Sequence, residues 1–439
     1  MDFSPERRRE IIAALRKGTV PQRGLDFLAV GLAGFEPVIA SELADVAEGG
    51  AMFKAVRGDY GCGKTFFARW VQEVAKKQGF ATAEVQISET ETPLHRLETV
   101  YRRAIEQLST TETFLGAFRS IIDGWFYGLE EDVLAEGTID PANETELSRR
   151  ADELLEQRLA EITRATPQFA AALRAYRMAQ RVNNHAMAEG LVGWLAGQPH
   201  VAAPVKRAAG IKGDVDHYAA LSFLRGLLLI LKESGYSGLV LVLDEIETLQ
   251  RVRGDVREKG LNALRQLIDD IDGGRFPNLY LLTTGTPAFF DGPQGIQRLE
   301  PLAQRLHVDF QTDARFDNPR AVQLRLPGFS LDRLCAVGCR VRDIFVQHAQ
   351  APSRVGELCD DRYIRDLAEG VAGRLGGKVG VAPRIFLKKL VADVLDRVDQ
   401  FADFHPRQDY ALTLAESELT RVERQALGAT DVDDIELNL

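Results

Sequence analysis

The chain has 439 residues, and at about 150 residues per domain this length predicts two or three domains. Hydrophobic residues make up 45% and charged residues 27%, which is the balance of a globular protein and excludes a collagen-like, fibrous or wholly disordered chain. The 54 Lys and Arg against 64 Asp and Glu give a formal net charge of −10, so a contact with DNA would need a local basic face.

The cysteines and the N-terminus favour a cytoplasmic protein. Four cysteines are too few and too scattered for a disulfide framework. Cys335 and Cys339 stand four residues apart but lack the second pair or the histidines of a zinc site. No apolar segment of signal-peptide length follows the first nine residues. The longest apolar runs are shorter than the ~20 residues of a membrane helix, so we expect no membrane contact.

Two helices are predicted before the first strand. Ser4-Pro5-Glu6 has the N-cap, the first-turn proline and the acidic first turn of a helix that continues to about residue 17. Gly18 ends it, and a turn-rich segment, 19–24, follows. Apolar residues at helical spacing then predict a second helix over 35–46.

The next segment has the pattern of a parallel α/β sheet. A strand is predicted over 51–57, a glycine-rich turn over 58–65, an amphipathic helix over 66–78 and a second strand over 82–87. Strand, loop, helix and strand in this order begin a sheet whose strands run in parallel.

A long helical stretch interrupts the strands. Residues 92–215 have helical patterns without a convincing strand, which predicts a helical insertion in the α/β domain. A helix over 218–232 then leads to a buried strand over 239–243. Further strands are predicted over 279–284, 307–310 and 322–326.

The strand signals stop after Pro327-Gly328. Helical patterns over 331–349, 361–375 and 383–398 predict a separate helical domain. We therefore divide the chain into an α/β domain, 1–327, and a helical domain, 328–439, that ends in an acidic tail at 431–436.

The glycine-rich turn matches the phosphate-binding pattern G-x-x-x-x-G-K-[ST] in full. Its backbone N–H groups and the N-terminus of the next helix can surround phosphates. Lys64 would reach the β- and γ-phosphates, and the Thr65 hydroxyl would bind Mg²⁺. The predicted ATP-binding residues are Gly58, Asp59, Tyr60, Gly61, Cys62, Gly63, Lys64, Thr65 and the helix residue Phe66.

Two carboxylates follow the buried strand over 239–243. Asp244, at the strand end, can hold the Mg²⁺ shell. Glu245 can orient and deprotonate an attacking water molecule, which favours hydrolysis of ATP over transfer to a small acceptor.

Three further positions are candidate catalytic residues. The strand over 279–284 ends in hydroxyls, and Thr284, with Thr286 as the alternative, could position the water. Arg305, with Arg298 as the alternative, could reach across a subunit boundary to the γ-phosphate. Arg384 stands in the first turn of a helix, where a cation is unfavourable unless an external anion such as the γ-phosphate answers it.

Taken in order, these features resemble the AAA+ superfamily of P-loop ATPases. The resemblance implies a Walker A motif at 58–65, a Walker B motif at 243–245, sensor 1 near Thr284, an arginine finger near Arg305 and sensor 2 at Arg384. It also implies that the helical domain is a lid. The Pro-Arg at its helix start is similar to the initiator and Cdc6-like branch, although the sensor 1 position lacks the usual Asn.

A second resemblance is closer. Val20-Pro21-Gln-Arg-Gly24, followed by Gly58-Asp-Tyr60-Gly-Cys-Gly-Lys-Thr65, resembles the ATP-binding proteins of bacteriophage-exclusion (BREX) systems. In that family a Val-Pro-x-x-Gly segment precedes a Gly-x-Tyr-Gly-x-Gly-Lys-[Ser/Thr] loop. The resemblance implies a defence ATPase, often encoded beside a helicase, in which Val20 and Pro21 border the adenine.

A DNA-binding surface is a weaker expectation. Arg174, Arg177 and Arg181 share one helix face, beside Tyr176, and further basic residues follow at 206, 207 and 212. This pattern has three interpretations, which are a solvated helix face, contact with DNA and contact with a partner protein.

We therefore expect an oligomeric ATPase that uses ATP and Mg²⁺, with a helicase or another defence protein as its partner. A nucleotide-gated switch with little turnover and a replication-initiator-like DNA loader are the alternatives. No winged-helix pattern is apparent after residue 400, which weighs against the loader.

Overall fold

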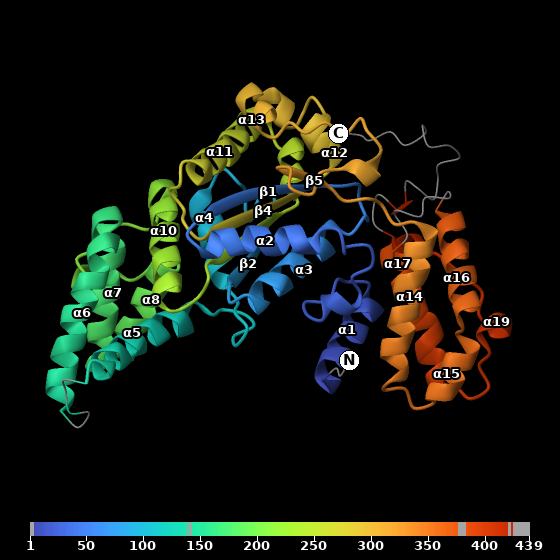
Figure 1. The fold of residues 1–439 in the computed structure, drawn as a ribbon, viewed down its shortest axis with the longest axis horizontal. Helices are drawn as coiled ribbons and strands as arrows, with labels where there is room; N and C mark the ends of the chain where they lie inside the picture. The colour runs from blue at the N-terminus through green and yellow to red at the C-terminus, as the bar shows by residue number, and fades with distance from the viewer. Residues whose placement is uncertain (1–3, 138–139, 141–142, 376–382, 420–422, 425–439) are drawn as a thin grey trace.

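A five-stranded parallel sheet forms the centre of the computed structural model, which describes residues 4–137, 140, 143–375, 383–419 and 423–424. The strand order is β2-β3-β4-β1-β5, so the strand that leads into the glycine-rich turn and the strand that ends in two carboxylates are separated by one neighbour (Figure 1). The predicted mixed α/β fold with a parallel sheet is confirmed. The strands are β1 (Ala51–Arg57), β2 (Ala81–Gln86), β3 (Leu239–Asp244), β4 (Leu279–Gly285) and β5 (Gln323–Arg325).

Both faces of the sheet are covered by helices. On β3, Leu241 packs in one core with residues of α4, α10 and α11, whereas its neighbour Val242 packs in the opposite core with residues of α2 and α3. Successive strand side chains point to opposite faces, so a strand buried on both sides must be apolar at every position, as the run over 239–243 is. These helices are α2 (Glu36–Ala47), α3 (Lys64–Lys77), α4 (Leu97–Glu106), α10 (His217–Glu233) and α11 (Gly254–Asp272).

The stretch between β2 and α10 is helical, as its sequence predicts. Its described residues contribute a single isolated bridge, between Ser109 and Thr82 of β2, and otherwise no sheet pairing. In Figure 1 these helices extend away from the sheet on the side opposite the C-terminal helices. After α4 come α5 (Phe118–Ala135), α6 (Glu144–Ala165), α7 (Pro167–Arg181), α8 (His185–Leu195) and α9 (Ala203–Ala208).

The helices after β5 form a core of their own, and the first helix of the chain packs in it. Ile11 and Leu15 of α1 (Pro5–Lys17) are buried against these helices, and Arg16 pairs with Asp396 at 2.6 Å. The acidic tail at 431–436 lies outside the described residues. The helices are α14 (Leu331–Val346), α15 (Pro352–Leu358), α16 (Asp361–Arg374), α17 (Pro383–Lys388), a π-helix (Lys389–Leu395) and α18 (Asp396–Gln400).

The predicted ends of α1 are confirmed. Ser4 has an extended conformation, and its hydroxyl accepts a hydrogen bond from the N–H of Arg7 at 3.3 Å. Gly18 ends the helix with φ 73°, a left-handed conformation that favours glycine.

The strand predicted over 307–310 is wrong, whereas the one over 322–326 is confirmed as the shorter β5. The centre of the Phe310 ring lies 4.7 Å from the guanidinium group of Arg57 and 5.0 Å from that of Arg325. Arg325 also donates to the carbonyl of Phe310 at 3.1 Å. This segment is therefore held by side chains of β1 and β5 and not by a ladder of backbone hydrogen bonds.

The remaining elements are short. No helix in the described ranges is long and apolar enough to cross a membrane. The short elements are η1 (Leu25–Phe27), η2 (Ile246–Arg251), α12 (Pro287–Asp291), η3 (Ile296–Arg298), α13 (Glu300–Arg305), η4 (Ala314–Phe316), α19 (Pro406–Asp409) and η7 (Glu416–Glu418).

Candidate active site

The turn between β1 and α3 has the backbone geometry of a phosphate-binding loop. Gly61 and Gly63 have φ angles of 82° and 95°, which residues with a side chain rarely adopt. A Cβ atom on Gly58 would lie 2.4 Å from the sulfur of Cys62 and 3.2 Å from the carbonyl oxygen of Leu326, so a side chain at this position would displace Cys62. The turn leads into the N-terminus of the 14-residue α3, whose first N–H groups attract anions.

Lys64 points back into its own loop. Its ammonium group donates to the carbonyl oxygens of Gly58 at 2.8 Å and Asp59 at 3.2 Å, and it lies 5.1 Å from the centre of the Tyr60 ring. The side chain is 8% exposed. Burial is also the first cause of the raised pKa of Tyr60, whose hydroxyl accepts a hydrogen bond from Arg251 at 3.2 Å.

Cys62 does not bring a reactive thiol to the loop. Burial raises the pKa of its thiol to about 11, which keeps it protonated at neutral pH.

The side-chain oxygens predicted to hold a metal ion lie together. The hydroxyl of Thr65 donates to Oδ2 of Asp244 at 2.8 Å, and Asp244 is buried at the end of β3. Thr284, on the adjacent strand β4, donates to the other carboxylate oxygen of Asp244. Hydroxyl and carboxylate oxygens are hard ligands of the kind that Mg²⁺ prefers, so the residues present fit this ion.

The hydroxyl of Thr284 forms hydrogen bonds with both residues of the Asp244-Glu245 pair. Besides its bond to Asp244, its hydroxyl accepts a hydrogen bond from the N–H of Glu245 at 3.1 Å, and the side chain is fully buried. The alternative, Thr286, is also buried and precedes α12. The geometry therefore gives Thr284 a positioning contact with the residues expected to do the chemistry.

Glu245 has an unusual backbone conformation. Its φ of 61° and ψ of 42° are left-handed, a conformation that non-glycine residues adopt rarely and mostly at functional sites. Its carboxylate accepts a hydrogen bond from the amide of Gln86 at 3.0 Å. Gln86 ends β2 and is paired in register with Asp244 on β3.

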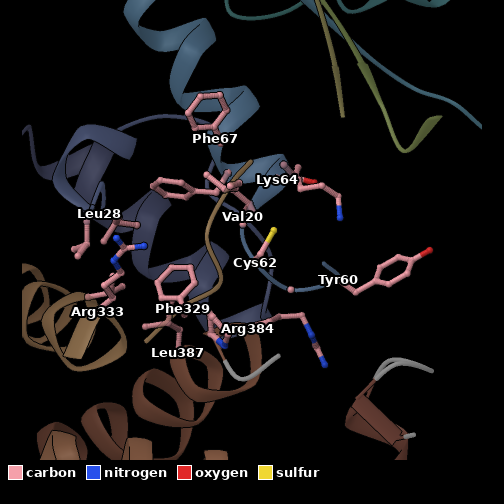
Figure 2. A pocket seen from close by; sticks show the side chains of 18 of the residues that line it. Val20, Leu28, Tyr60, Cys62, Lys64, Phe67, Phe329, Arg333, Arg384 and Leu387 are labelled. Carbon is pink, nitrogen blue, oxygen red and sulfur yellow. The ribbon is translucent and has the colours of Figure 1, made fainter. Parts of the chain in front are cut away.

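A cavity of about 380 Å³ opens beside the loop, which is within the usual range for small-molecule sites. Figure 2 shows the apolar side chains of Leu28 and Phe329 on one side of it, and Tyr60 and Lys64 on the other. The predicted site residues that line it are Val20, Pro21, Tyr60, Gly61, Cys62, Gly63, Lys64, Thr65, Phe66, Asp244, Glu245 and Arg384. An apolar end and a cationic, oxygen-rich end suit a purine base and its phosphates.

Arg384 faces the cavity but already has partners. Its guanidinium group forms a two-pronged ion pair with Glu423 and donates to the carbonyl of Glu418 at 2.7 Å. Glu418 also accepts from Lys389 at 2.8 Å and Lys388 at 3.2 Å. The C-terminal segment thus provides the anion that the first-turn arginine was expected to need.

Arg305 and Arg298 lie away from the cavity. Arg305 ends α13 and pairs with Asp269 at 2.5 Å and Asp272 at 3.2 Å, both on α11. Arg298 is within 3.4 Å of the amide oxygen of Gln294. Neither arginine lines the cavity of its own chain.

The arginine stripe on α7 is engaged by carboxylates. Arg174 pairs with Glu156 at 2.6 Å, and Arg181 pairs with Asp152 at 2.5 Å. Arg177 is only 5% exposed and pairs with Asp152 at 3.1 Å. The stripe is therefore not a free basic face, although Arg207 and Lys212 are exposed elsewhere.

The sequence analysis missed two residues that lie close to the predicted carboxylates. Glu247, two residues after Glu245, lines the cavity and is buried, and Gln86 binds Glu245. Gln86 ends the strand that neighbours β3, so its polar side chain could have been predicted to lie near Glu245 if the strand order had been known. A third carboxylate so close to Asp244-Glu245 was the one available signal for Glu247.

A family model described as "BREX system ATP-binding protein BrxC/D" matches residues 3–414. This match confirms the resemblance drawn from the Val-Pro segment and the phosphate-binding loop. No curated protein and no solved structure matches the chain.

Proposed function

We propose, from the premise that this chain belongs to the family of BREX system ATP-binding proteins, that it is an AAA+-like ATPase that hydrolyses ATP to ADP and phosphate. The proposal rests on one observation, which is that groups from three elements lie together at one end of the sheet. The loop before α3 and the carboxylates after β3 line one cavity, and the buried hydroxyl of Thr284 on β4 donates to one of those carboxylates, Asp244, at the same end of the sheet. Ligands of parallel sheets bind at this end.

The roles of the residues follow from their positions. The N–H groups of residues 61–65 bind phosphate oxygens, and Lys64 turns from its own loop to the phosphates. Thr65 and Asp244 hold Mg²⁺, which when bound neutralises charge on the phosphates. Glu245 orients the attacking water molecule and accepts its proton, and Thr284 keeps Asp244 and Glu245 in position.

We further propose a division of labour along the chain. Residues 1–327 form the nucleotide-binding domain with a helical insertion at 92–215, except that α1 packs in the core of the C-terminal helices. Residues 328–439 form a lid that supplies Arg384 to the phosphates. Arg305 or Arg298 acts on the site of a neighbouring copy in a homo-oligomer. The protein works in the cytoplasm with a helicase or another defence protein, and DNA is a further candidate ligand.

The substitution Glu245→Gln tests the chemistry. It keeps the size of the side chain but removes the base, so the variant is expected to bind ATP as the wild type does and to lose turnover at least 100-fold. Glu258→Gln, at an exposed carboxylate on α11, is the matched control and is expected to hydrolyse ATP normally. A wild-type rate for the Glu245→Gln variant would remove Glu245 from this role.

The oligomer is tested by the ATPase rate per subunit as a function of protein concentration, with and without duplex DNA. A composite site predicts a rate that rises with concentration and that collapses in Arg305→Ala. Arg298→Ala, measured in parallel, distinguishes the two candidates. A rate indifferent to concentration and to both substitutions would leave each subunit with a self-contained site.

A nucleotide-gated switch with little turnover is the second candidate. The observation that favours it is that three cations expected to act on phosphates are already occupied. Lys64 binds carbonyl oxygens, Arg305 binds aspartates of α11 and Arg384 binds Glu423. Turnover that stays negligible with DNA and a partner protein present would support the switch.

A further inference from the structure

Glu247 is a buried carboxyl group at the phosphate end of the cavity. It lies in η2, directly after the Asp244-Glu245 pair, and is 3% exposed. Its Oε1 atom is 4.0 Å from the ammonium nitrogen of Lys64. Its Oε2 atom has no hydrogen-bond partner in the described part of the chain. A buried carboxyl oxygen normally has a hydrogen-bond partner, so the unpaired Oε2 atom needs an explanation.

Lys64 is therefore held by the chain itself. The two loop carbonyls accept two of its three protons, the Tyr60 ring lies beside it, and the Glu247 carboxyl group is its acidic neighbour. In this arrangement the loop satisfies its own cation without a nucleotide. A phosphate group that binds Lys64 must therefore displace the ammonium group from these partners.

Glu247 cannot readily move away when that happens. Arg257 of α11 donates to three carbonyl oxygens of the segment that carries it, those of Leu249 at 3.2 Å, Gln250 at 2.8 Å and Val252 at 3.0 Å. Arg251 binds Tyr60 at 3.2 Å. The short helix is thus tied both to α11 and to the phosphate-binding loop.

We propose that Glu247 is a positioning residue that holds Lys64 in the empty loop and lowers the affinity of the site for nucleotides in proportion to their phosphate charge. The inference rests on the proposed ATP-binding function of this cavity. When phosphates draw Lys64 away, Glu247 is left as a buried negative charge that has lost its cation and faces further negative charge. The effect is largest for the triphosphate and smaller for the diphosphate, and it speeds release of the product.

The electrostatic surroundings of Glu247 agree with this proposal. Burial raises its pKa to about 7, Lys64 counters that shift, and Glu245 and Asp244 add to it. Lys64 therefore does not fully offset the free-energy cost of a negative charge on buried Glu247. If phosphates draw Lys64 away, that cost increases.

The experiment measures binding of ATP, ADP and adenosine to the full chain at pH 8 by calorimetry. Glu247→Gln keeps the shape of the side chain and removes its charge. We expect this variant to bind ATP about tenfold tighter, ADP about threefold tighter and adenosine unchanged, and to release ADP more slowly in stopped flow. A purely structural role would weaken binding of all three ligands.

Glu42→Gln is the matched control, because Glu42 is also buried and paired with a lysine, Lys54 at 2.5 Å, but lies outside the cavity. It is expected to leave all three affinities unchanged. If Glu247→Gln does not fold, Glu247→Asp withdraws the carboxylate by one methylene, and intermediate tightening for ATP is expected.

Wild-type or weaker ATP binding by the folded Glu247 variants, or equal tightening for adenosine, would overturn the inference. Failure of the wild-type chain to bind any adenine nucleotide would instead overturn the proposed function. The two failures are therefore distinguishable in one set of titrations.

Discussion

Two neighbouring threonines on β4 offer a direct test of the site. Thr283 and Thr284 are both fully buried. The hydroxyl of Thr284 contacts Asp244 and the N–H of Glu245, whereas that of Thr283 has no hydrogen-bond partner among the described residues. Valine resembles threonine in shape and lacks the hydroxyl. The pair Thr284→Val and Thr283→Val therefore separates the loss of these bonds from the general effect of the substitution.

The expected magnitudes follow from these contacts. A hydrogen bond to a charged group contributes about 1.5–3 kcal/mol to stability. In Thr284→Val, Asp244 loses such a bond, and the N–H of Glu245 keeps only the carboxylate of Asp244, at 3.2 Å. We expect the free energy of unfolding to fall by about 2 kcal/mol. Thr283→Val removes an unpaired buried hydroxyl and is expected to be neutral, or stabilising by up to about 1 kcal/mol.

The same contacts set the expected rates. If the whole of the ~2 kcal/mol is also lost in the transition state, kcat falls about 30-fold, because 1.36 kcal/mol is a factor of ten. The assay is phosphate release at saturating ATP over a series of Mg²⁺ concentrations, with urea unfolding measured on the same samples. A Thr284→Val rate within threefold of wild type, or equal losses in both variants, would refute the reasoning.

Three further predictions concern neighbouring residues. Lys54→Met strands the buried carboxylate of Glu42 and is expected to lower the free energy of unfolding by about 3–5 kcal/mol in urea denaturation. Because burial raises the pKa of Glu247 from 4.5 to about 7, its contribution to stability is complete below pH 4.5 and is lost as the pH rises through 7. Urea unfolding at pH 6 and pH 8 should therefore show a decrease of about 1 kcal/mol that Glu247→Gln lacks. Gln86→Ala frees the carboxylate of Glu245 and is expected to lower kcat about tenfold, in steady-state assays, without changing the Kd of ATP.

Each of these has a result that contradicts it. A Lys54→Met variant as stable as wild type would mean that Glu42 accepts a proton or finds water. The same pH dependence in wild type and Glu247→Gln would assign it to other groups. A change in Kd without a change in kcat would make Gln86 a binding residue.

The glycine-rich turn between β1 and α3 was predictable because its determinants are local. Gly61 and Gly63 permit a backbone that other residues resist, and the loop is bounded by a strand and a helix that their own patterns reveal. The buried strand before Asp244 was equally visible, because a strand covered on both faces is apolar throughout.

The contacts among these residues depend on strand order, which the sequence does not display. Gln86 reaches Glu245 because β2 pairs with β3, and Thr284 reaches Asp244 because β4 lies on the other side of β3. The sequence analysis chose Thr284 for a water molecule, and the structure gives it carboxylate and backbone partners. Local patterns identified the residue but not the atoms that it touches.

Partners from distant segments explain the remaining differences. The spacing of the arginines on α7 correctly placed them on one face, but that face meets the carboxylates of α5 and α6. The segment over 307–310 has the apolar content of a strand, but Arg57 and Arg325 hold it through Phe310. In both cases a side chain far away in the sequence decides the outcome.

The packing of α1 among the C-terminal helices has a mechanical consequence. The chain passes between that core and the sheet twice, through residues 18–32 and through residues 326–330, and both connections line the cavity. A body joined to another at two points can rotate easily only about the line through them. Because both connections line the cavity, a ligand there would lie beside this axis, and a small displacement of the lining close to the axis would become a larger one at the far ends of the helices.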